Sequence, residues 1–218
     1  FSTDTAKKAQ ELGADGAGLF RTEFLYTGRP DLPGEEEQFA VYKAALEAMP
    51  GKAITFRTMD IGGDKPVEAL GLEQEQNAFL GYRAIRICLD RPELFLTQLR
   101  ALLRASAFGK VQIMFPMIAT LEELRRAKEY VAQAKEQLAQ KGQAFDPNTP
   151  VGMMVEVPAA AVLARQFARE ADFFSIGSND LTQYTMAADR MNPKVEHLSN
   201  PMDPAVLTLI AQTIQAAK

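Results

Sequence analysis

Short, continuous apolar runs alternate along the chain with longer segments in which apolar residues recur at helical spacing. The runs cover residues 17–20, 53–56, 111–115, 151–155 and 173–176. Most of them are continuous rather than alternating, which is typical of strands that are covered on both faces. The alternation of these runs with helical segments predicts βα units with parallel strands, and therefore an α/β fold.

The segments between the runs carry signals for helix starts and ends. Thr120 and Glu123 form a capping-box pattern, and Gly142 ends the amphipathic segment that follows them. Pro92 and Pro204 lie where two further helices are expected to begin, because proline is tolerated in the first turn of a helix. These signals predict helices between the expected strands.

Two architectures contain a regular βα alternation: a TIM (β/α)8-type barrel and an open, doubly wound sheet. The nucleotide-binding fingerprints GxGxxG and GxxxxGK[ST] are absent from the sequence, which favours the barrel. A length of 218 residues, of which 47% are hydrophobic, is enough for one domain with its own core. We therefore expect residues 1–218 to form a single barrel-type domain.

The charge and the cysteine content indicate which kind of partner and which cellular compartment to expect. Lys and Arg number 24 against 28 Asp and Glu, and no basic tract concentrates the positive charge, so nucleic acid is not an expected partner. The single cysteine, Cys88, cannot form an internal disulfide, and no apolar run is long enough for membrane insertion. We expect a cytoplasmic protein. The chain begins at Phe1 within a helix-forming segment, so we expect a piece of a longer polypeptide.

Polar and charged residues follow the expected strands at their carboxyl ends. They are Arg21 and Glu23, Arg57 and Asp60, Glu156, and Asn179 and Asp180. Parallel strands bring these ends to one face, which in a barrel holds the active site. Arginines suit phosphate or carboxylate groups, and carboxylates suit Mg²⁺. The set predicts a site for a phosphorylated anion and a divalent metal; the alternative for any one arginine is a structural ion pair.

Several segments together resemble the phosphoenolpyruvate-binding barrel of the Enzyme I family, the phosphoenolpyruvate-protein phosphotransferases of the bacterial sugar phosphotransferase system. The matching segments are GLFRTEFLY from Gly18, RTMDIGGDK from Arg57, FLGYRAIR from Phe79, LRASAFGKVQIMFPMI from Leu103, GMMVEVPAAA from Gly152 and FFSIGSNDLTQYTMAADR from Phe173. They span nearly the whole chain. Pyruvate phosphate dikinase and phosphoenolpyruvate synthase share the RTE, ExPxA and ND elements, whereas the RTMDIGGDK and YRAIR segments are more similar to Enzyme I.

The resemblance implies substrate-binding roles for four arginines. Those that match the family's phosphoenolpyruvate-holding residues are Arg21, Arg57 and Arg190, and Arg83 matches a further arginine of the same site. We expect Arg57, Arg83 and Arg190 to be catalytic, because phosphoryl transfer depends on positioning and on charge stabilisation.

The resemblance also implies a metal site. Glu156 and Asp180 match the residues that coordinate Mg²⁺, and Asn179 together with Asp180 matches a pair that touches the substrate. A few carboxylates combined with substrate oxygens are what Mg²⁺ prefers. Lys65 is expected either to add positive charge nearby or to be a solvated loop lysine.

Two parts of the family's machinery have no counterpart in this sequence. The phosphoryl acceptor of the family is a histidine on a separate N-terminal domain, and the single histidine here, His197, lies in no matching context and is expected to be structural. The family's acid–base cysteine lies on an eighth strand that would follow Lys218, and Cys88 is expected to be a small, buried apolar residue instead. The resemblance thus implies an incomplete barrel, with strands two to seven and without the first and eighth.

The leading hypothesis is the phosphoenolpyruvate- and Mg²⁺-binding domain of an Enzyme I-type phosphotransferase. The resemblance implies a homodimer. It also implies that the phosphoryl group of phosphoenolpyruvate passes to a histidine on another domain and then to the histidine-containing phosphocarrier protein in sugar uptake. The fragment alone is expected to be inactive. The enzymatic alternative is the barrel of a pyruvate phosphate dikinase or phosphoenolpyruvate synthase, and the alternative of another class is a non-catalytic dimerisation or regulatory module.

Overall fold

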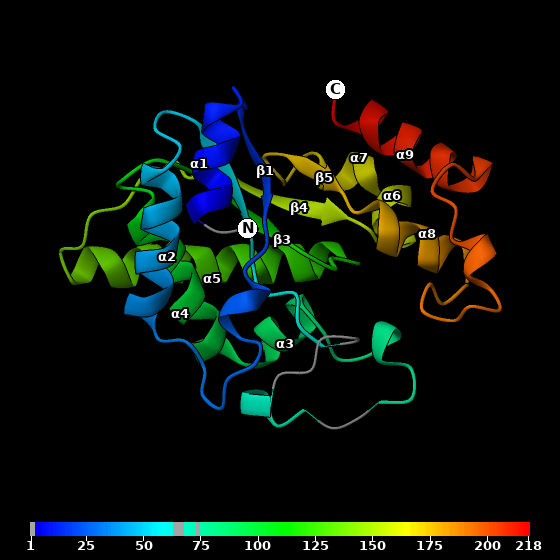
Figure 1. Ribbon diagram of the computed structural model, residues 1–218, viewed down its shortest axis with the longest axis horizontal. Helices are drawn as coiled ribbons and strands as arrows, with labels where there is room; N and C mark the ends of the chain where they lie inside the picture. Colours follow the sequence, from blue (N-terminus) through cyan, green and yellow to red (C-terminus); the bar gives the residue numbers. More distant parts are fainter. Residues whose placement is uncertain (1–2, 63–67, 73–74) are drawn as a thin grey trace.

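The computed structural model describes residues 3–62, 68–72 and 75–218, and these contain one curved sheet of five parallel strands (Figure 1). The strands are β1 (Gly16–Phe20), β2 (Ala53–Arg57), β3 (Lys110–Phe115), β4 (Val151–Val155) and β5 (Phe174–Ile176). They pair in chain order, so that each strand lies beside the next one in the sequence. This order places all the carboxyl ends of the strands at one edge.

Helices connect the strands and flank the sheet. The α-helices are α1 (Thr3–Glu11), α2 (Glu35–Glu47), α3 (Ile85–Asp90), α4 (Pro92–Ala105), α5 (Leu121–Gln140), α6 (Pro158–Val162), α7 (Ala164–Phe167), α8 (Ser178–Met186) and α9 (Pro204–Ala216). Short 3₁₀ turns are η1 (Glu23–Leu25), η2 (Glu68–Leu70), η3 (Ala78–Leu80) and η4 (Glu196–Leu198). Three of these turns, η1, η2 and η3, lie in the loops that follow β1 and β2 at the carboxyl edge.

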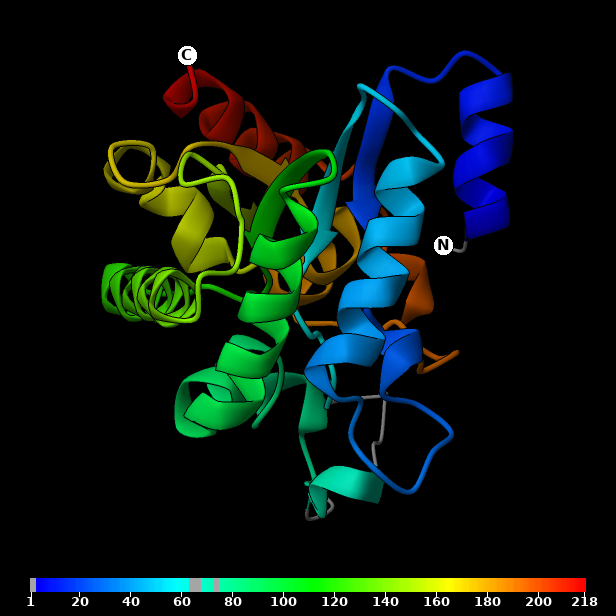
Figure 2. The ribbon, with the colours of Figure 1, turned by 90° about the vertical axis from the view of Figure 1, so that its left-hand side faces the viewer.

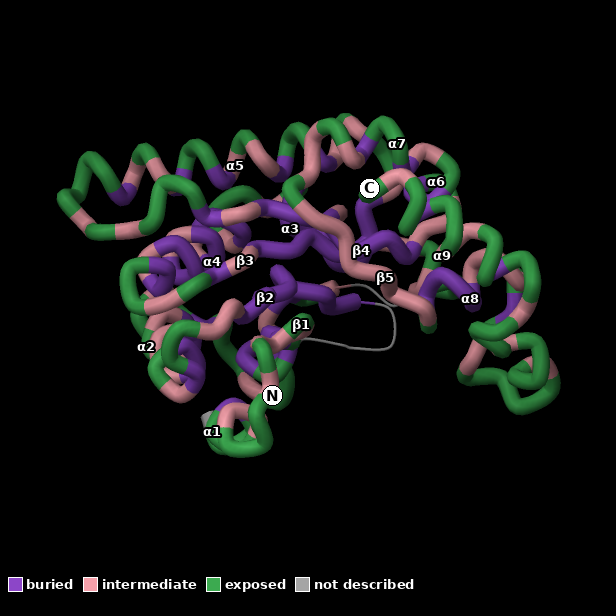
Figure 3. The backbone as a smooth tube through the Cα atoms, turned by 90° about the horizontal axis from the view of Figure 1, so that it is seen from above, coloured by how far each residue is buried: buried purple, intermediate pink, exposed green. Residues whose placement is uncertain are grey.

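The convex side of the sheet is covered by helices that pack against one another in chain order. Helix α2 contacts α4, and α4 contacts α5, which Figure 2 shows along its axis. Seen from above, the central strands β2, β3 and β4 and the inward faces of these helices are mostly buried, while the edge strands β1 and β5 are mostly of intermediate burial and the outward helix faces are exposed (Figure 3). The core therefore lies between the convex side of the sheet and this layer of helices.

Neighbouring residues of β2 face opposite sides of the sheet, as successive side chains of a strand must. The ring of Phe56 packs against Tyr42 of α2, with ring centroids 5.2 Å apart, on the helix-covered side. The guanidinium of Arg57 instead reaches the sulfur of Met154 on β4, at 3.7 Å, across the concave side. The strand period thus directs Arg57 into the hollow of the curved sheet.

Each of the five apolar runs forms a strand, which confirms the prediction of parallel βα units. The capping box is also confirmed: Glu123 N–H donates to Thr120 Oγ1 at 3.1 Å, and the Glu123 carboxylate accepts from Thr120 N–H at 2.9 Å. Proline lies in the first turn of α4 and of α9 as expected, and at α9 Asp203 accepts the Ala205 N–H.

The sheet is a curled half-barrel and fits an incomplete barrel, but the strand numbering expected from the sequence is not established. Strands two to seven would be six strands, whereas the described residues form five, one for each apolar run. Within the described part of the chain, β1 and β5 each pair with a single neighbour and are the edges of the sheet.

Two further expectations concern burial and the membrane. Cys88 in α3 is fully buried, and burial raises the pKa of its thiol far above the usual range, so it is the inert apolar residue that was expected. Across the described part of the chain, every helix is too short or too polar to span a bilayer.

We expect Thr120→Ala to lower the free energy of unfolding by about 1 kcal/mol, because it removes the side-chain half of the cap at α5. Urea denaturation of the wild type and of Thr120→Ala measures this loss of stability. Thr208→Ala is the matched control, since the exposed Thr208 hydroxyl donates only to Pro204 O within its own helix, and its cost should stay below about 0.5 kcal/mol. Equal costs for the two substitutions would contradict the assigned cap.

Candidate functional site

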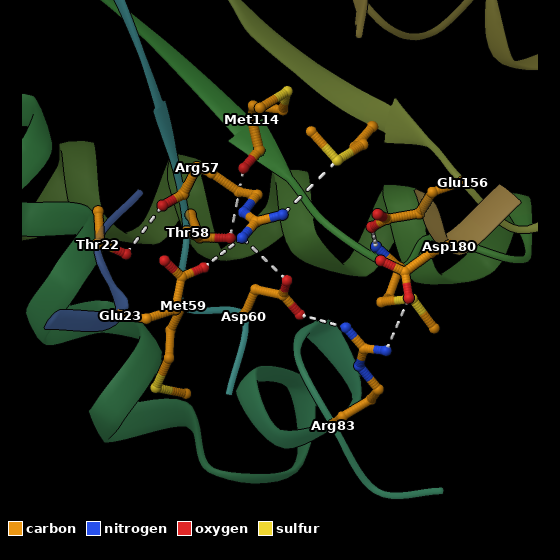
Figure 4. Close-up of polar contacts among 12 residues, drawn as sticks. Thr22, Glu23, Arg57, Thr58, Met59, Asp60, Arg83, Met114, Glu156 and Asp180 are labelled. Atoms are coloured by element: carbon orange, nitrogen blue, oxygen red, sulfur yellow. Dashed lines mark hydrogen bonds and ion pairs between the residues drawn. The ribbon is translucent and has the colours of Figure 1, made fainter. Parts of the chain in front are cut away.

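The carboxyl edge of the sheet gathers charged side chains from several loops (Figure 4). Arg57 is the last residue of β2, and Glu156 follows β4 directly. Asp180 lies in the first turn of α8, just after β5, and Glu23 begins η1 after β1. Curvature of the sheet brings these strand ends, distant in the sequence, close together on its concave side (Figure 4).

Arginines and carboxylates alternate along a continuous chain of ion pairs at this edge. Arg57 contacts Glu23 at 2.5 Å and Asp60 at 3.0 Å through the same nitrogen, Nη2. Arg83 contacts the other oxygen of Asp60 at 2.9 Å and Asp180 at 3.1 Å. Asp60 is therefore shared by two guanidinium groups, one at each carboxylate oxygen.

The chain of ion pairs ends at a second contact to Asp180. Arg190 approaches the same oxygen, Oδ1, at 3.5 Å, and its side chain is half-buried. Its main-chain N–H donates to Gln183 Oε1 at 3.0 Å, which ties the segment after α8 back to that helix. Two arginines thus meet one carboxylate.

The ion pairs are removed from water, which makes them strong and mutually dependent. The side chain of Arg83 is 1% exposed and that of Asp60 is 2% exposed. Burial opposes the charged form of Arg83, but Asp60 and Asp180 outweigh it and raise the pKa of the guanidinium above its ordinary value. Removing either partner would leave an uncompensated buried charge.

Glu156 belongs to the same edge but has a different environment. Its Oε1 accepts the Met117 N–H at 2.6 Å, and its side chain is almost fully buried. Burial raises the pKa of Glu156 to about 8, and the nearby carboxylates Asp60 and Asp180 add to the increase, while the Met117 N–H and Arg57 oppose it. Burial is thus the main reason, and the two neighbouring carboxylates a further one, why the protonated form of Glu156 is favoured.

The charges at this edge suit a cation. The carboxylates of Glu23, Asp60, Glu156 and Asp180 face the guanidinium groups of Arg57, Arg83 and Arg190. Of these seven described side chains four are acidic and three are basic, and Glu156, beside Asp180 (Figure 4), is the acidic one outside the chain of ion pairs. Within the described residues, no group of three or more His, Cys, Asp or Glu side chains is arranged to hold a metal alone. Two carboxylates completed by ligand oxygens are, however, the donor set that Mg²⁺ accepts.

The loop after β2 approaches Arg83 so closely that residue 62 must be glycine. Gly62 has φ +92°, and a Cβ there would lie 2.8 Å from both the Arg83 Cβ and the Tyr82 carbonyl oxygen. Ala84, next to Arg83, also has a positive φ, of 53°. A strained backbone around Arg83 fits a site where side-chain position matters.

Phe79 and Tyr184 flank the arginines. The ring centroid of Phe79 lies 5.9 Å from the guanidinium carbon of Arg83 and 5.3 Å from that of Arg190. The Tyr184 hydroxyl accepts from Arg83 Nη1 at 3.1 Å and donates to the Phe79 carbonyl oxygen. Tyr184 thereby ties Arg83 to the η3 turn.

A cavity of about 580 Å³ opens beside the ion pairs. Its lining includes Phe79, Met117, Val157, Pro158, Gln183 and Tyr184. The arginines and carboxylates of the ion-pair chain are not among its walls, although Tyr184 and Phe79 touch both the cavity and the arginines. We place the candidate site at the charged edge, since charge and burial are concentrated there, and regard the cavity as adjoining space.

The structure brings most of the predicted site residues together, but not all of them. Arg57, Arg83, Arg190 and Asp180 join the chain of ion pairs, and Glu156 lies beside it. Arg21 and Asn179 are exposed at the ends of β1 and β5 and lie outside the ion pairs that the described residues form. Their substrate-binding roles, like those of the other residues, stay predictions.

Two further expectations from the sequence concern Lys65 and His197. Lys65 lies outside the described residues. His197 is exposed in η4 and takes no part in the ion pairs at the strand ends or in the walls of the cavity, as far as the described residues go.

The sequence alone assigns no individual role to several residues that the structure places at the site. Glu23 and Asp60 belong to the strand-end charges that predict a site for an anion and a metal, but the sequence does not identify them as the partners of Arg57. The spacing of Asp60, three residues after Arg57, was the available signal. Tyr184, one helical turn after Asp180 on α8, was a second signal, because residues four apart share a helix face.

A parallel, curled α/β sheet with arginines and carboxylates at the carboxyl edge defines a barrel-type ligand-binding domain. The sequence matches the family described as "PEP-utilising enzyme, PEP-binding domain" over residues 2–218. The chain belongs to this family. It is 59% identical over 214 residues to the phosphoenolpyruvate-protein phosphotransferases of Bacillus sp. (strain S) and of Geobacillus stearothermophilus, and 58% identical over 214 residues to that of Bacillus subtilis (strain 168).

The matches cover 98% of this chain but only 37%, 37% and 38% of those relatives, so the chain spans just over a third of their length. Among solved structures, a citrate lyase from Burkholderia xenovorans LB400 is similar in fold, with a TM-score of 0.57 and 14% sequence identity; the match covers 99% of this chain and 56% of that one. At this identity the likeness concerns the fold alone.

We expect Gly62→Ala to destabilise the protein more than Gly142→Ala. Both glycines have positive φ, so both substitutions carry a backbone cost of about 1–2 kcal/mol, but a Cβ at Gly142 meets no atom within 4 Å. At Gly62 the added contacts with Arg83 and Tyr82 should cost about 1–3 kcal/mol more. Guanidinium denaturation measures both, and equal losses would contradict the close approach.

Proposed function

We propose that the chain binds phosphoenolpyruvate together with Mg²⁺ at the carboxyl edge of its sheet. The proposal rests on one observation: buried guanidinium groups alternate there with carboxylates, and a further carboxyl group, that of Glu156, lies beside Asp180. Guanidinium groups suit the phosphate and carboxylate of the substrate, and the oxygens of two neighbouring carboxyl groups suit a divalent cation.

In this proposal the arginines bind the anion in part through N–H groups that no atom of the described residues accepts, which requires the buried edge to open to the ligand. The Nε atoms of Arg57 and Arg83 are buried and have no hydrogen-bond partner among the described residues. Because a buried donor without a partner is costly, a ligand oxygen at these atoms would lower the free energy of the site. Arg190 and the exposed Arg21 are assigned to the same anion, and Asn179 with Asp180 to its other polar atoms.

Glu156 and Asp180 are the proposed Mg²⁺ ligands. A divalent ion there supplies charge stabilisation to phosphate oxygens. The role of the two carboxylates is to hold the ion, while Arg57, Arg83 and Arg190 keep the anion oriented and offset the charge that develops on its oxygens. Burial of this edge strengthens each of these interactions, because the local dielectric constant is lower than that of water.

We assign the chain to the phosphoenolpyruvate-binding part of a phosphotransferase. In the proposed reaction the P–O bond of phosphoenolpyruvate breaks, the phosphoryl group forms a P–N bond with a histidine on a separate domain, and pyruvate leaves after its enolate is protonated. The phosphoryl group then passes to a histidine-containing phosphocarrier protein in sugar uptake. The names of the relatives support this assignment over a pyruvate phosphate dikinase or phosphoenolpyruvate synthase. The cytoplasmic location remains the prediction made from the sequence.

We further propose that the protein acts as a homodimer. Exposed apolar side chains on α6, α9 and the segment before α9 support this proposal. They are Val162, Met202, Leu207 and Ile214. The non-catalytic dimerisation or regulatory module differs from the favoured proposal in one measurable respect, since it requires no binding of phosphoenolpyruvate.

Glu156→Gln and Asp180→Asn should each weaken Mg²⁺-dependent binding of phosphoenolpyruvate by about tenfold or more, since each removes one charged ligand of the proposed ion. Calorimetric titration of the chain with phosphoenolpyruvate, with and without Mg²⁺, measures the effect. Glu129→Gln, on the exposed side of α5, is the control and should leave the affinity unchanged.

Two results of this titration would count against the proposal. Absence of phosphoenolpyruvate binding by the wild-type chain in the presence of Mg²⁺ would reject it and favour the non-catalytic module. An unchanged Mg²⁺ dependence in both variants would reject the assignment of Glu156 and Asp180 as the metal ligands.

Arg57→Lys and Arg190→Lys should each lower the affinity for phosphoenolpyruvate by about tenfold or more, because lysine keeps the charge but cannot form paired hydrogen bonds in one plane. The loss of affinity should be larger for Arg57, because its substitution also disturbs the ion pairs of Nη2 with Glu23 and Asp60. The same titration measures it, with Arg165→Lys on the exposed side of α7 as the control. Wild-type affinity in both variants would show that these arginines are structural.

A further inference from the structure

A set of buried polar side chains lies beneath the carboxyl ends of β1 and β2, outside the ion pairs. It comprises Thr22, Tyr26, Gln38, Tyr42 and Gln98, each of which is at most 1% exposed. Their hydrogen bonds join α2, α4 and the two turns that follow the strands. We call these five residues the amide relay, because two glutamine side chains are its branching points.

Gln98 of α4 uses both sides of its amide group in the relay. Its Oε1 accepts the Met59 N–H at 2.9 Å. Its Nε2 donates to Thr22 Oγ1 at 3.1 Å and to the Tyr42 hydroxyl at 3.2 Å. Only a side chain with an acceptor and two donors in one plane can make all three bonds.

The two neighbours of Gln98 continue the relay in opposite directions. Thr22 Oγ1, having accepted from Gln98, donates to the main-chain oxygen of Arg57 at 2.9 Å. The Tyr42 hydroxyl donates to Gln38 Oε1 at 3.0 Å, and Gln38 in turn donates to the Pro33 carbonyl oxygen at 3.1 Å. Each hydroxyl therefore both accepts and donates, so the directions of the bonds are consistent throughout.

We propose that Gln98 is a positioning residue for Arg57 and Asp60 in phosphoenolpyruvate binding. This inference rests on the proposed function of the same edge. Gln98 holds the Met59 N–H directly, and through Thr22 it holds the Arg57 carbonyl. The turn between Arg57 and Asp60 is thereby fixed at two main-chain points from the helix-covered side.

A third bond fixes the same turn from the sheet. The Thr58 N–H donates to the Met114 carbonyl oxygen at 2.9 Å, which continues the β2–β3 pairing past the end of β2. With these three anchors the main chain from Arg57 to Met59 has little freedom. The side chains of Arg57 and Asp60 project from this turn and meet in the ion pair of 3.0 Å. Losing the Gln98 anchors would release the turn on one side.

Gln112 offers a matched control on the same sheet. It is a partly buried glutamine of β3, and its Oε1 accepts from the hydroxyl of Thr55 on β2 at 2.7 Å. It resembles Gln98 in size and in forming a hydrogen bond with β2, but among the described residues it forms no side-chain hydrogen bond with the turn after Arg57. A substitution at Gln112 thus removes a partly buried hydrogen bond to β2 without removing an anchor of that turn.

The test compares Gln98→Met with Gln112→Met. Methionine has a volume similar to that of glutamine but lacks the amide group. Calorimetry measures phosphoenolpyruvate affinity with Mg²⁺ at a temperature where each variant is folded. NMR follows the Nε–Hε signal of Arg57 without ligand, assigned by its loss in Arg57→Lys. We expect Gln98→Met to weaken binding by about tenfold and to shift the Arg57 signal, because the guanidinium loses its fixed orientation. Gln112→Met should change neither.

A second pair of variants keeps the test decisive if Gln98→Met does not fold. Thr22→Val removes the hydroxyl at nearly constant shape, whereas Thr22→Ser keeps it. We expect Thr22→Val to weaken binding and shift the Arg57 signal, and Thr22→Ser to restore both. This rescue by a hydroxyl alone is a result that loss of packing cannot produce.

The outcomes separate this inference from the proposed function. A wild-type chain that fails to bind phosphoenolpyruvate rejects the proposed function and, with it, the role of Gln98 in that binding, even if the Arg57 signal still shifts. Normal binding by the wild type together with an unchanged affinity and Arg57 signal in Gln98→Met and Thr22→Val overturns the positioning role alone. Equal losses in Gln98→Met and Gln112→Met overturn it as well, since the effect would then be general destabilisation.

Discussion

The carboxylate of Asp60, shared between Arg57 and Arg83, is the interaction on which the rest of this edge depends. Each oxygen pairs with a different guanidinium, and all three side chains are almost completely buried. Moving a single ion out of water costs several kcal/mol, so burying any one of the three without the others would strongly destabilise the protein. The alternation of signs, continued to Glu23 and Asp180, is therefore a condition for keeping arginines inside the protein.

The surrounding scaffold explains why these ion pairs keep one geometry. The amide relay holds the turn after Arg57 from the side of the helices, and Gly62 lets the loop after β2 pass close to Arg83. Tyr184 joins Arg83 to the η3 turn. Since long charged side chains lose much conformational freedom when they are ordered, such rigid neighbours reduce the entropy cost of binding a ligand between them.

Family and fold carry different information about this chain. A citrate lyase with 14% identity has a similar fold, whereas the phosphoenolpyruvate-protein phosphotransferases are more than half identical over nearly all of the chain. A barrel-type sheet supports many chemistries, so the functional argument depends on the side chains at its edge. The carboxyl groups of Glu156 and Asp180 beside the buried arginines, rather than the sheet, are what support the proposal of a cation and an anionic ligand.

The sequence by itself determined the elements that depend on local pattern. Continuous apolar runs located all five strands, Thr120 with Glu123 located the start of α5, and the strand-end charges located the edge at which Arg57 and Asp180 lie. Tertiary structure alone decided which of those charges meet. Arg83 pairs with Asp180, 97 residues away, and Gln98 reaches Thr22 across 76 residues, while Arg21 and Asn179 stay exposed. Such contacts depend on the register and curvature of the whole sheet, which no local spacing encodes.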